Sequence, residues 1–150
     1  MELADMIEMR NILLGLSITS KAELLRNLSG LAAERTGIGA SVILDVLANR
    51  ERLGSTGIGN GVAIPHGNVP NLTAPFRLLV RLQRSIDYEA IDGLPVDLVF
   101  LALSPLEKGS SHLNLLAEIA RNARSEIWLQ AVRQAPSPAA VHALLASTNT

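Results

Sequence analysis

The feature that most constrains the fold is an almost unbroken apolar run from Asp97 to Leu103, which Pro105 ends. A strand of this kind, without alternation, is typical of the middle of a sheet that is covered on both faces. The segment Phe76 to Leu82 alternates instead, with Arg77 and Arg81 on the face opposite its apolar residues, and predicts a half-buried strand. The sequence therefore predicts a sheet with at least one fully covered strand.

Helical patterns flank these strands. Ser20 and Glu23 form a capping-box pattern that begins a helix, and Gly37 is expected to end it. Further helices are expected over residues 41–52, after a cap at Ser110 or Ser111, and at about 127–133 and 138–145. Strands interleaved with helices, around a strand covered on both faces, predict an α/β sandwich rather than a helix bundle or a barrel.

The composition fits one compact domain. Of the 150 residues 48% are hydrophobic and 18% charged, which excludes an intrinsically disordered chain. The formal net charge of −1 provides no field toward nucleic acid or an anionic membrane, and the lack of cysteine excludes disulfides and thiol chemistry. The sequence starts without a signal-peptide pattern, and its apolar runs are far shorter than a membrane span. We therefore expect a cytoplasmic protein that neither inserts into a membrane nor binds nucleic acid.

The segment from Leu53 to Gly67 is the most unusual part of the chain, with five glycines and the ending Pro-His-Gly. Glycine permits a close approach of the backbone, so successive amides can converge on an anion. The spacing matches neither the dinucleotide-binding fingerprint nor the P-loop. The glycines alone are consistent both with a phosphate cradle and with a purely structural turn.

Three residues in and around this segment suggest chemistry. His66 follows a strand end and a proline, which would present its imidazole to a partner, although a lone histidine is more often an ordinary surface or core residue. His112 lies at the expected start of a helix, where unsatisfied amides favour anions. Arg50 continues an apolar helix stripe, and its planar guanidinium suits phosphate. Brought together, these groups would suit phosphoryl transfer.

The other candidates favour structural interpretations. His142 is expected on a helix surface, and three histidines without a cysteine or a His-x-x-x-His spacing predict no metal site. Asp87, Glu89 and Asp92 are better explained as a solvated turn at an Asp-Gly step than as a paired-carboxylate site. Trp128 is expected to fill the core or its edge, since it lies on an apolar helix face.

Residues 49–67 and 86–100, together with the Ser-His-Leu at 111–113, resemble the EIIA domains of the phosphotransferase system of the fructose/mannitol type. The resemblance is strongest to the nitrogen-related branch, EIIA-Ntr, because of the Gly-Ser-Thr-Gly-Ile-Gly stretch. It covers nearly the whole chain, best over about 20–147. It implies one EIIA domain over residues 1–150, an α/β sandwich with a mixed β-sheet flanked by helices.

The resemblance also implies a function. His66 would accept a phosphoryl group from a phosphorylated HPr-like carrier (NPr), through Nε2, and Arg50 and His112 would hold the phosphate. Supporting contacts are expected from Ser55, Thr56 and Gly67. No metal or small cofactor is required. The phosphorylation state would then control regulatory targets such as potassium-transport or sensor-kinase components, and Ile58 and Val69 are expected to form the docking surface from their positions.

One residue departs from the family pattern, and two other functions stay open. Asn68 stands where EIIA-Ntr proteins usually carry a basic residue, so its amide can donate a hydrogen bond but without a charge. One alternative is a regulator whose contacts do not depend on phosphorylation and whose histidine site is vestigial. The other is a sugar-uptake EIIA that passes the phosphoryl group to an EIIB domain.

Overall fold

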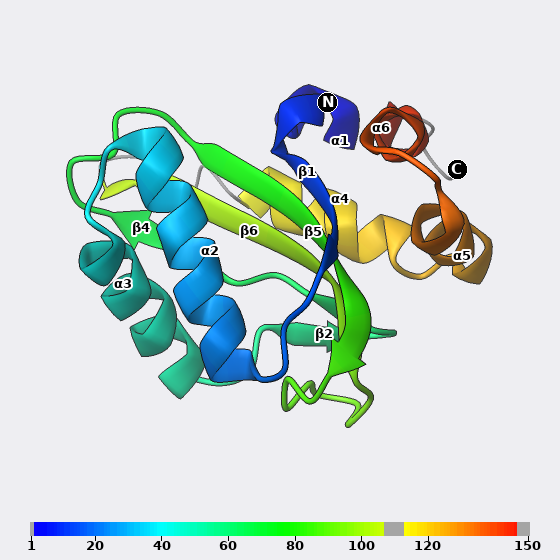
Figure 1. The fold of residues 1–150 in the computed structure, drawn as a ribbon, viewed down its shortest axis with the longest axis horizontal. Helices are drawn as coiled ribbons and strands as arrows, with labels where there is room; N and C mark the ends of the chain where they lie inside the picture. The colour runs from blue at the N-terminus through cyan, green and yellow to red at the C-terminus, as the bar shows by residue number, and fades with distance from the viewer. Residues whose placement is uncertain (1, 107–112, 147–150) are drawn as a thin grey trace.

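The computed structural model describes residues 2–106 and 113–146, so Ser110, Ser111 and His112 lie outside the described residues (Figure 1). Within these limits the chain forms a six-stranded sheet covered by helices. The strands are β1 (Ile12–Leu16), β2 (Gly57–Gly59), β3 (Val62–Ala63), β4 (His66–Val69), β5 (Phe76–Ile86) and β6 (Val96–Pro105). The helices are α1 (Leu3–Met6), α2 (Lys21–Thr36), α3 (Ala40–Arg52), α4 (Leu113–Asn122), α5 (Glu126–Gln134) and α6 (Pro138–Ala146), with a 3-10 turn at Met9–Asn11.

The sheet is mixed, as the resemblance implies. Its order is β1-β5-β6-β3-β2, and β4 also pairs with β6. β5 and β6 run antiparallel, β1 is parallel to β5, and β3 and β4 are both parallel to β6. β3 and β4 follow one another along the same edge of β6, where Val62 lies opposite Leu98 and His66 opposite Ala102. This register places His66 beside the central strand.

Helices cover both faces of the sheet, which confirms the predicted sandwich. α2 and α3 lie together on one face, while α4 runs across the other, with α5, α6 and α1 beside it (Figure 1). On the first face Val80 and Leu101 pack with Leu47, and on the second Phe100 packs with Ile119. β6 is buried along nearly its whole length, as its unbroken apolar run predicts.

The prediction of a half-buried strand at 76–82 was wrong in one respect. β5 has the expected alternation, but the face that carries the arginines is also covered. Arg81 donates from Nη1 to the carbonyls of Val132 and Ala135, each at 2.8 Å, and so satisfies the carbonyl end of α5. Its charge therefore stabilises a helix end and does not face open solvent.

The predicted helix caps are largely confirmed. The amide of Glu23 donates to Ser20 Oγ at 3.1 Å, and α2 ends at Gly37 with φ +78°, the left-handed conformation that glycine favours. The side chain of Glu23 does not close the capping box, because it accepts instead from Thr19 Oγ1 at 2.7 Å. Among the described residues, no helix combines the length and the apolar character needed to cross a membrane.

Candidate functional site

The glycine-rich segment contains a β-hairpin. β2 and β3 pair antiparallel around a tight turn in which Asn60 and Gly61 have φ of 57° and 81°. Two positive φ values in succession are typical of a type I′ turn, which only residues such as asparagine and glycine adopt readily. The hairpin brings the start of the segment back to its end, since the amide of Ile64 donates to the carbonyl of Thr56 at 2.9 Å.

Side chains from distant parts of the chain hold this turn. Asp92 Oδ2 accepts from the amide of Asn60 at 2.9 Å, and Arg133 Nη2 donates to the carbonyl of Asn60 at 2.6 Å. Arg133 is itself fixed by Asp97, with Nε at 2.9 Å from Oδ2. The hairpin is therefore a rigid support for the residues on either side of it.

His66 is the first residue of β4. Its Nδ1 lies 2.8 Å from the carbonyl oxygen of Ile64. A carbonyl can only accept, so Nδ1 carries the proton and donates, and the neutral ring keeps its lone pair on Nε2. The backbone of the Ile-Pro-His turn thus fixes the tautomer and the orientation of the imidazole.

His66 lines a cavity of about 210 Å³. The cavity lies between the end of α3, the start of the glycine-rich segment, β4 and α4. Its walls are formed by Arg50, Ser55, Thr56, Ile58, Ile64, His66, Leu116 and Ala120. The structure therefore brings four predicted site residues together with four apolar ones. A mostly apolar pocket with a few convergent polar groups is typical of a binding site.

Arg50 reaches this cavity from the last turn of α3. Its Nη1 donates to the carbonyl of Gly54 at 2.9 Å, which uses one of the five N–H donors of the guanidinium and holds the group beside the loop. The bond ties the helix end to the loop that follows it. The other donors of the guanidinium can then serve an anion in the cavity.

The hydroxyls of Ser55 and Thr56 form hydrogen bonds to residues that do not line the cavity. Ser55 Oγ donates to the carbonyl of Tyr88 at 3.3 Å and accepts from the amide of Gly57 at 3.1 Å. The amide of Thr56 donates to Glu51 Oε1 at 3.1 Å. The hydroxyl of Thr56 contacts Glu51 Oε2, and it also lies 2.9 Å from the Tyr88 hydroxyl. These hydroxyls therefore already have protein partners, and they contribute to the cavity mainly through the shape of the loop.

The supporting network ends at a partly buried ion pair that the sequence did not reveal. Lys21 Nζ lies 2.9 Å from Glu51 Oε1 and 4.5 Å from the centre of the Tyr88 ring. Burial, and then the Glu51 charge, raise the pKa of Tyr88 well above its usual range, so the phenol stays neutral and can donate. Lys21 begins α2 and Glu51 lies in the last turn of α3, and no spacing rule pairs positions so far apart in sequence.

Two further predicted positions lie outside the cavity wall. Gly67 faces α3, and a Cβ at this position would overlap Val46 Cγ1, so glycine allows β4 to approach the helix closely. Asn68 Nδ2 donates to the carbonyl of Pro105 at 3.2 Å, which ties β4 to the end of β6. Val69, expected on a docking surface, is fully buried against the α2–α3 face, so that expectation was wrong.

The remaining candidate residues have structural roles. Asp92 accepts from the amides of Asn60 and Leu94, and these bonds hold the pKa of its carboxyl below the usual value. This confirms the predicted turn. His142 Nε2 lies 3.1 Å from the carbonyl of Ala4 and joins α6 to α1, so it is less exposed than predicted. Within residues 2–106 and 113–146 no three His, Cys, Asp or Glu side chains cluster as metal ligands would.

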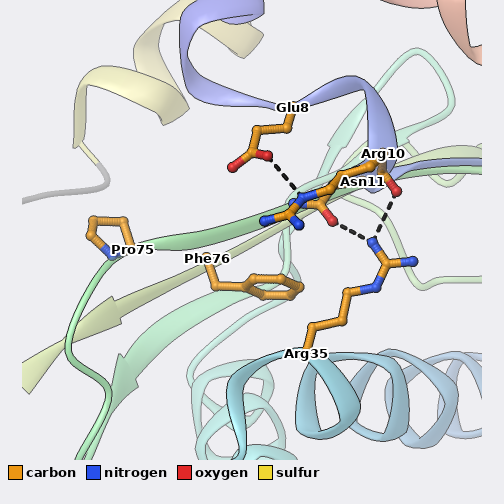
Figure 2. A pocket seen from close by; sticks show the side chains of 6 residues that line it. All are labelled: Glu8, Arg10, Asn11, Arg35, Pro75 and Phe76. Atoms are coloured by element: carbon orange, nitrogen blue, oxygen red, sulfur yellow. Dashed lines mark hydrogen bonds and ion pairs between the residues drawn. The ribbon is translucent and has the colours of Figure 1, made fainter.

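A larger cavity, of about 420 Å³, lies elsewhere in the fold (Figure 2). It is lined by Glu8, Arg10, Asn11, Arg35, Pro75 and Phe76, none of which the sequence singled out. Arg35 Nη1 donates to the carbonyl of Arg10 at 2.9 Å and to Asn11 Oδ1, while Arg10 Nε pairs with Glu8 at 2.8 Å. These groups satisfy one another and fasten the N-terminal segment to the end of α2.

The fold and the cavity define the class of protein. The crystal structure of IIA mannitol from Escherichia coli has the same fold, with a TM-score of 0.73 at 20% identity, covering 90% of this chain and 95% of that one. The crystal structure of the nitrogen regulatory protein IIA-Ntr from Neisseria meningitidis superposes with a TM-score of 0.89 at 28% identity, covering 95% and 98% of the two chains. The mixed sheet between two helical layers is thus an EIIA fold.

Sequence comparison identifies the family. The family model for the phosphoenolpyruvate-dependent sugar phosphotransferase system, EIIA 2, matches residues 5–148. A nitrogen regulatory protein from Bradyrhizobium diazoefficiens is 43% identical over 97% of this chain and 95% of its own length. The chain belongs to the EIIA 2 family of the phosphotransferase system, and it is similar to nitrogen regulatory proteins of that family. This confirms the resemblance seen in the sequence.

Proposed function

We propose that this domain accepts a phosphoryl group on His66 from a phosphorylated HPr-like carrier and regulates partner proteins according to its phosphorylation state. The observation that carries the proposal is the bond from His66 Nδ1 to the carbonyl of Ile64 at 2.8 Å. It leaves the lone pair on Nε2 in the neutral ring, and a nucleophile needs such a lone pair. The same imidazole lines a cavity with the Arg50 guanidinium, which suits a phosphoryl group.

The reaction is an in-line transfer between two imidazoles. Nε2 of His66 attacks the phosphorus, the N–P bond of the carrier's phosphohistidine breaks, and a new N–P bond forms on His66. The proton stays on Nδ1, which donates to the carbonyl of Ile64, so attack through Nε2 needs no separate base. The transfer requires hydrogen-bond donors that stabilise the charge on the equatorial oxygens of the phosphoryl group. The proposed reaction contains no step at a metal or a cofactor.

We assign the donor roles as the sequence resemblance implies. Arg50 binds the phosphoryl oxygens, helped by His112, which lies outside the described residues. Ser55 and Thr56 support the group through the shape of their loop, and Gly67 does so by letting β4 lie close to α3. Residues 1–150 form one EIIA domain in this proposal, with the family match at 5–148 in its support.

The regulatory part follows from the charge of the product. A phosphoryl group on His66 adds about two negative charges beside an apolar wall that includes Ile58 and Leu116. Such a change creates or abolishes a protein contact without a change of fold. The regulated partners are of the kind that EIIA-Ntr proteins control, such as potassium-transport or sensor-kinase components, and the domain acts in the cytoplasm.

The test is intact-mass analysis after incubation with phosphoenolpyruvate, Enzyme I and an HPr-type carrier. Wild type is expected to gain one acid-labile phosphoryl group, His66→Ala none, and the matched control His142→Ala the same as wild type. Labelling of a folded His66→Ala protein would contradict the assignment.

Two further outcomes would point to the other functions. A folded wild type that takes no label from several carriers would favour a regulator that binds independently of phosphorylation. Rapid transfer from labelled wild type to a purified EIIB domain would favour sugar uptake over regulation.

A further inference from the structure

Arg77 lies in the same row of the sheet as His66, with one residue between them. Ala102 of β6 is the register partner of His66 in the parallel pair with β4 and of Arg77 in the antiparallel pair with β5. Register partners point to the same face of a sheet, so all three side chains stand on the α4 face. Two strand spacings separate His66 and Arg77 by about 10 Å between Cα atoms, and only the methyl group of Ala102 stands between them.

The guanidinium of Arg77 is half-buried and carries a charge without a partner. No hydrogen bond or ion pair joins it to another residue in the part of the chain that the structure describes. Burial lowers its pKa below the usual value, because removal of water disfavours the charged form. Arg81 lies further along β5 on the same face. It differs from Arg77 because its guanidinium donates hydrogen bonds to two carbonyls. A desolvated cation without a counter-charge is costly, and such groups are normally paired.

A phosphoryl group on His66 would supply the missing counter-charge. Its three oxygens need donors on more than one side, and Arg50 approaches only from the end of α3. Arg77 lies on β5, on the other side of Ala102 from His66, so its guanidinium would have to extend across Ala102 on the α4 face to reach the group. Since its donors have no partner among residues 2–106 and 113–146, their interaction with the phosphoryl oxygens is gained only when the group arrives. Interactions that strengthen in this way favour the transition state and the product over the starting state.

We propose that Arg77 is a second cationic ligand, beside Arg50, for the phosphoryl group carried by His66. This inference rests on the function proposed above and names a residue that the family resemblance did not indicate. Arg77 stabilises the charge that develops on the oxygens during transfer and slows the loss of the phosphoryl group from His66.

The experiment compares Arg77→Met and Arg77→Lys with the control Arg84→Met. Arg84 lies on the same strand, is exposed, and its replacement changes the net charge equally. Each protein is phosphorylated by two donors, an HPr-type carrier and phosphoramidate. With phosphoramidate the P–N bond breaks, the bond to Nε2 forms, and the amine leaves as ammonia after protonation by water. The small donor separates binding of the phosphoryl group from docking of a carrier.

Arg77→Met is expected to label about tenfold more slowly than Arg84→Met with both donors, which is the effect of losing one charge-assisted hydrogen bond. Arg77→Lys is expected to fall between them, because lysine keeps the charge but not the planar fork. The melting temperature of Arg77→Met is expected to equal or exceed that of Arg84→Met, since an uncompensated charge has been removed.

If wild type is labelled normally, three results would overturn this inference without affecting the proposed function. Equal labelling rates for Arg77→Met and Arg84→Met would exclude a role in phosphoryl binding. Slower labelling from the carrier but not from phosphoramidate would make Arg77 a docking contact. Loss of folding in Arg77→Met without rescue by lysine would make it structural. A wild type that takes no label on His66 from either donor would instead remove the proposed function, and this inference with it.

Discussion

The backbone amide of Thr56 donates to Glu51 Oε1 at 3.1 Å, so the loop beside His66 is held by a carboxylate at the end of α3. The same carboxylate pairs with Lys21 at 2.9 Å and contacts the Tyr88 hydroxyl at 3.3 Å. One nearly buried charge therefore fixes a helix start, a helix end and the loop that shapes the cavity. A buried acceptor with this many donors is costly to replace, because each donor is left without a partner.

Replacement of Glu51 by glutamine is expected to lower the free energy of unfolding by about 3 kcal/mol, because it leaves the Lys21 ammonium uncompensated. It is also expected to slow labelling of His66, since the Thr56 loop loses its anchor. Urea unfolding and intact-mass kinetics measure the two effects. Glu34→Gln, the same change at an exposed position of α2, is the control. A loss of stability no larger than that of the control would show that the network does not hold the loop.

Gly67 is expected to tolerate no side chain unless α3 gives way. Gly67→Ala places a methyl group into Val46 Cγ1, and this overpacking is expected to destabilise the protein by about 1–3 kcal/mol. Val46→Ala opens the space, so the double variant Gly67→Ala/Val46→Ala should recover a large part of the loss. A double-mutant cycle from chemical unfolding measures the coupling. Additive losses would mean that the close approach of β4 and α3 does not explain the glycine.

The fold was predictable where a single segment determines its own environment. The unbroken apolar run of β6 predicted a strand covered on both faces, and Ser20 and Gly37 predicted the limits of α2, because caps and periodicity are local properties. The second covered face of β5 was missed, because the partners of Arg81 are carbonyls about fifty residues later in the chain. Local alternation cannot report such a partner.

The candidate site likewise has a part that the sequence predicted and a part that it did not. His66 and Arg50 belong to one continuous motif, so the sequence marked both before the structure placed them on one cavity. Lys21 and Tyr88 support that cavity from other segments, and their sequence neighbourhoods look like an ordinary helix start and an ordinary turn. The packing of α2 against α3 brings Lys21 to Glu51, and the segment after β5 brings the Tyr88 hydroxyl there, so only the tertiary fold reveals that these polar atoms meet.

Asp92 is expected to contribute stability that depends on pH. Bonds from the amides of Asn60 and Leu94 favour its charged form, so its folded pKa lies below the unfolded value near 3.8. For a carboxyl with a lowered pKa, the contribution is complete above the unfolded pKa and is lost as the pH falls through the folded pKa. The difference in unfolding free energy between wild type and Asp92→Asn should be constant from pH 7 to 5 and shrink below about pH 4.

Urea unfolding at each pH tests this expectation, with Asp45→Asn on the exposed part of α3 as the control. A difference between wild type and Asp92→Asn that does not change with pH would show that the turn depends on the shape of the side chain and not on its charge.

The position of the phosphoryl group on the ring follows from the orientation of His66. Nδ1 donates to the carbonyl of Ile64 at 2.8 Å, so attack through Nδ1 would require loss of that bond and a turn of the ring between Pro65 and Gly67. The phosphorylated protein is therefore expected to carry the group on Nε2, with the Nδ1 proton retained. Long-range proton–nitrogen NMR spectra of protein labelled with ¹⁵N-histidine distinguish the two isomers, and His142 provides an internal unmodified reference. Phosphorus coupling to Nδ1 would show that the ring reorients before transfer, and that the Ile64 carbonyl does not direct the chemistry.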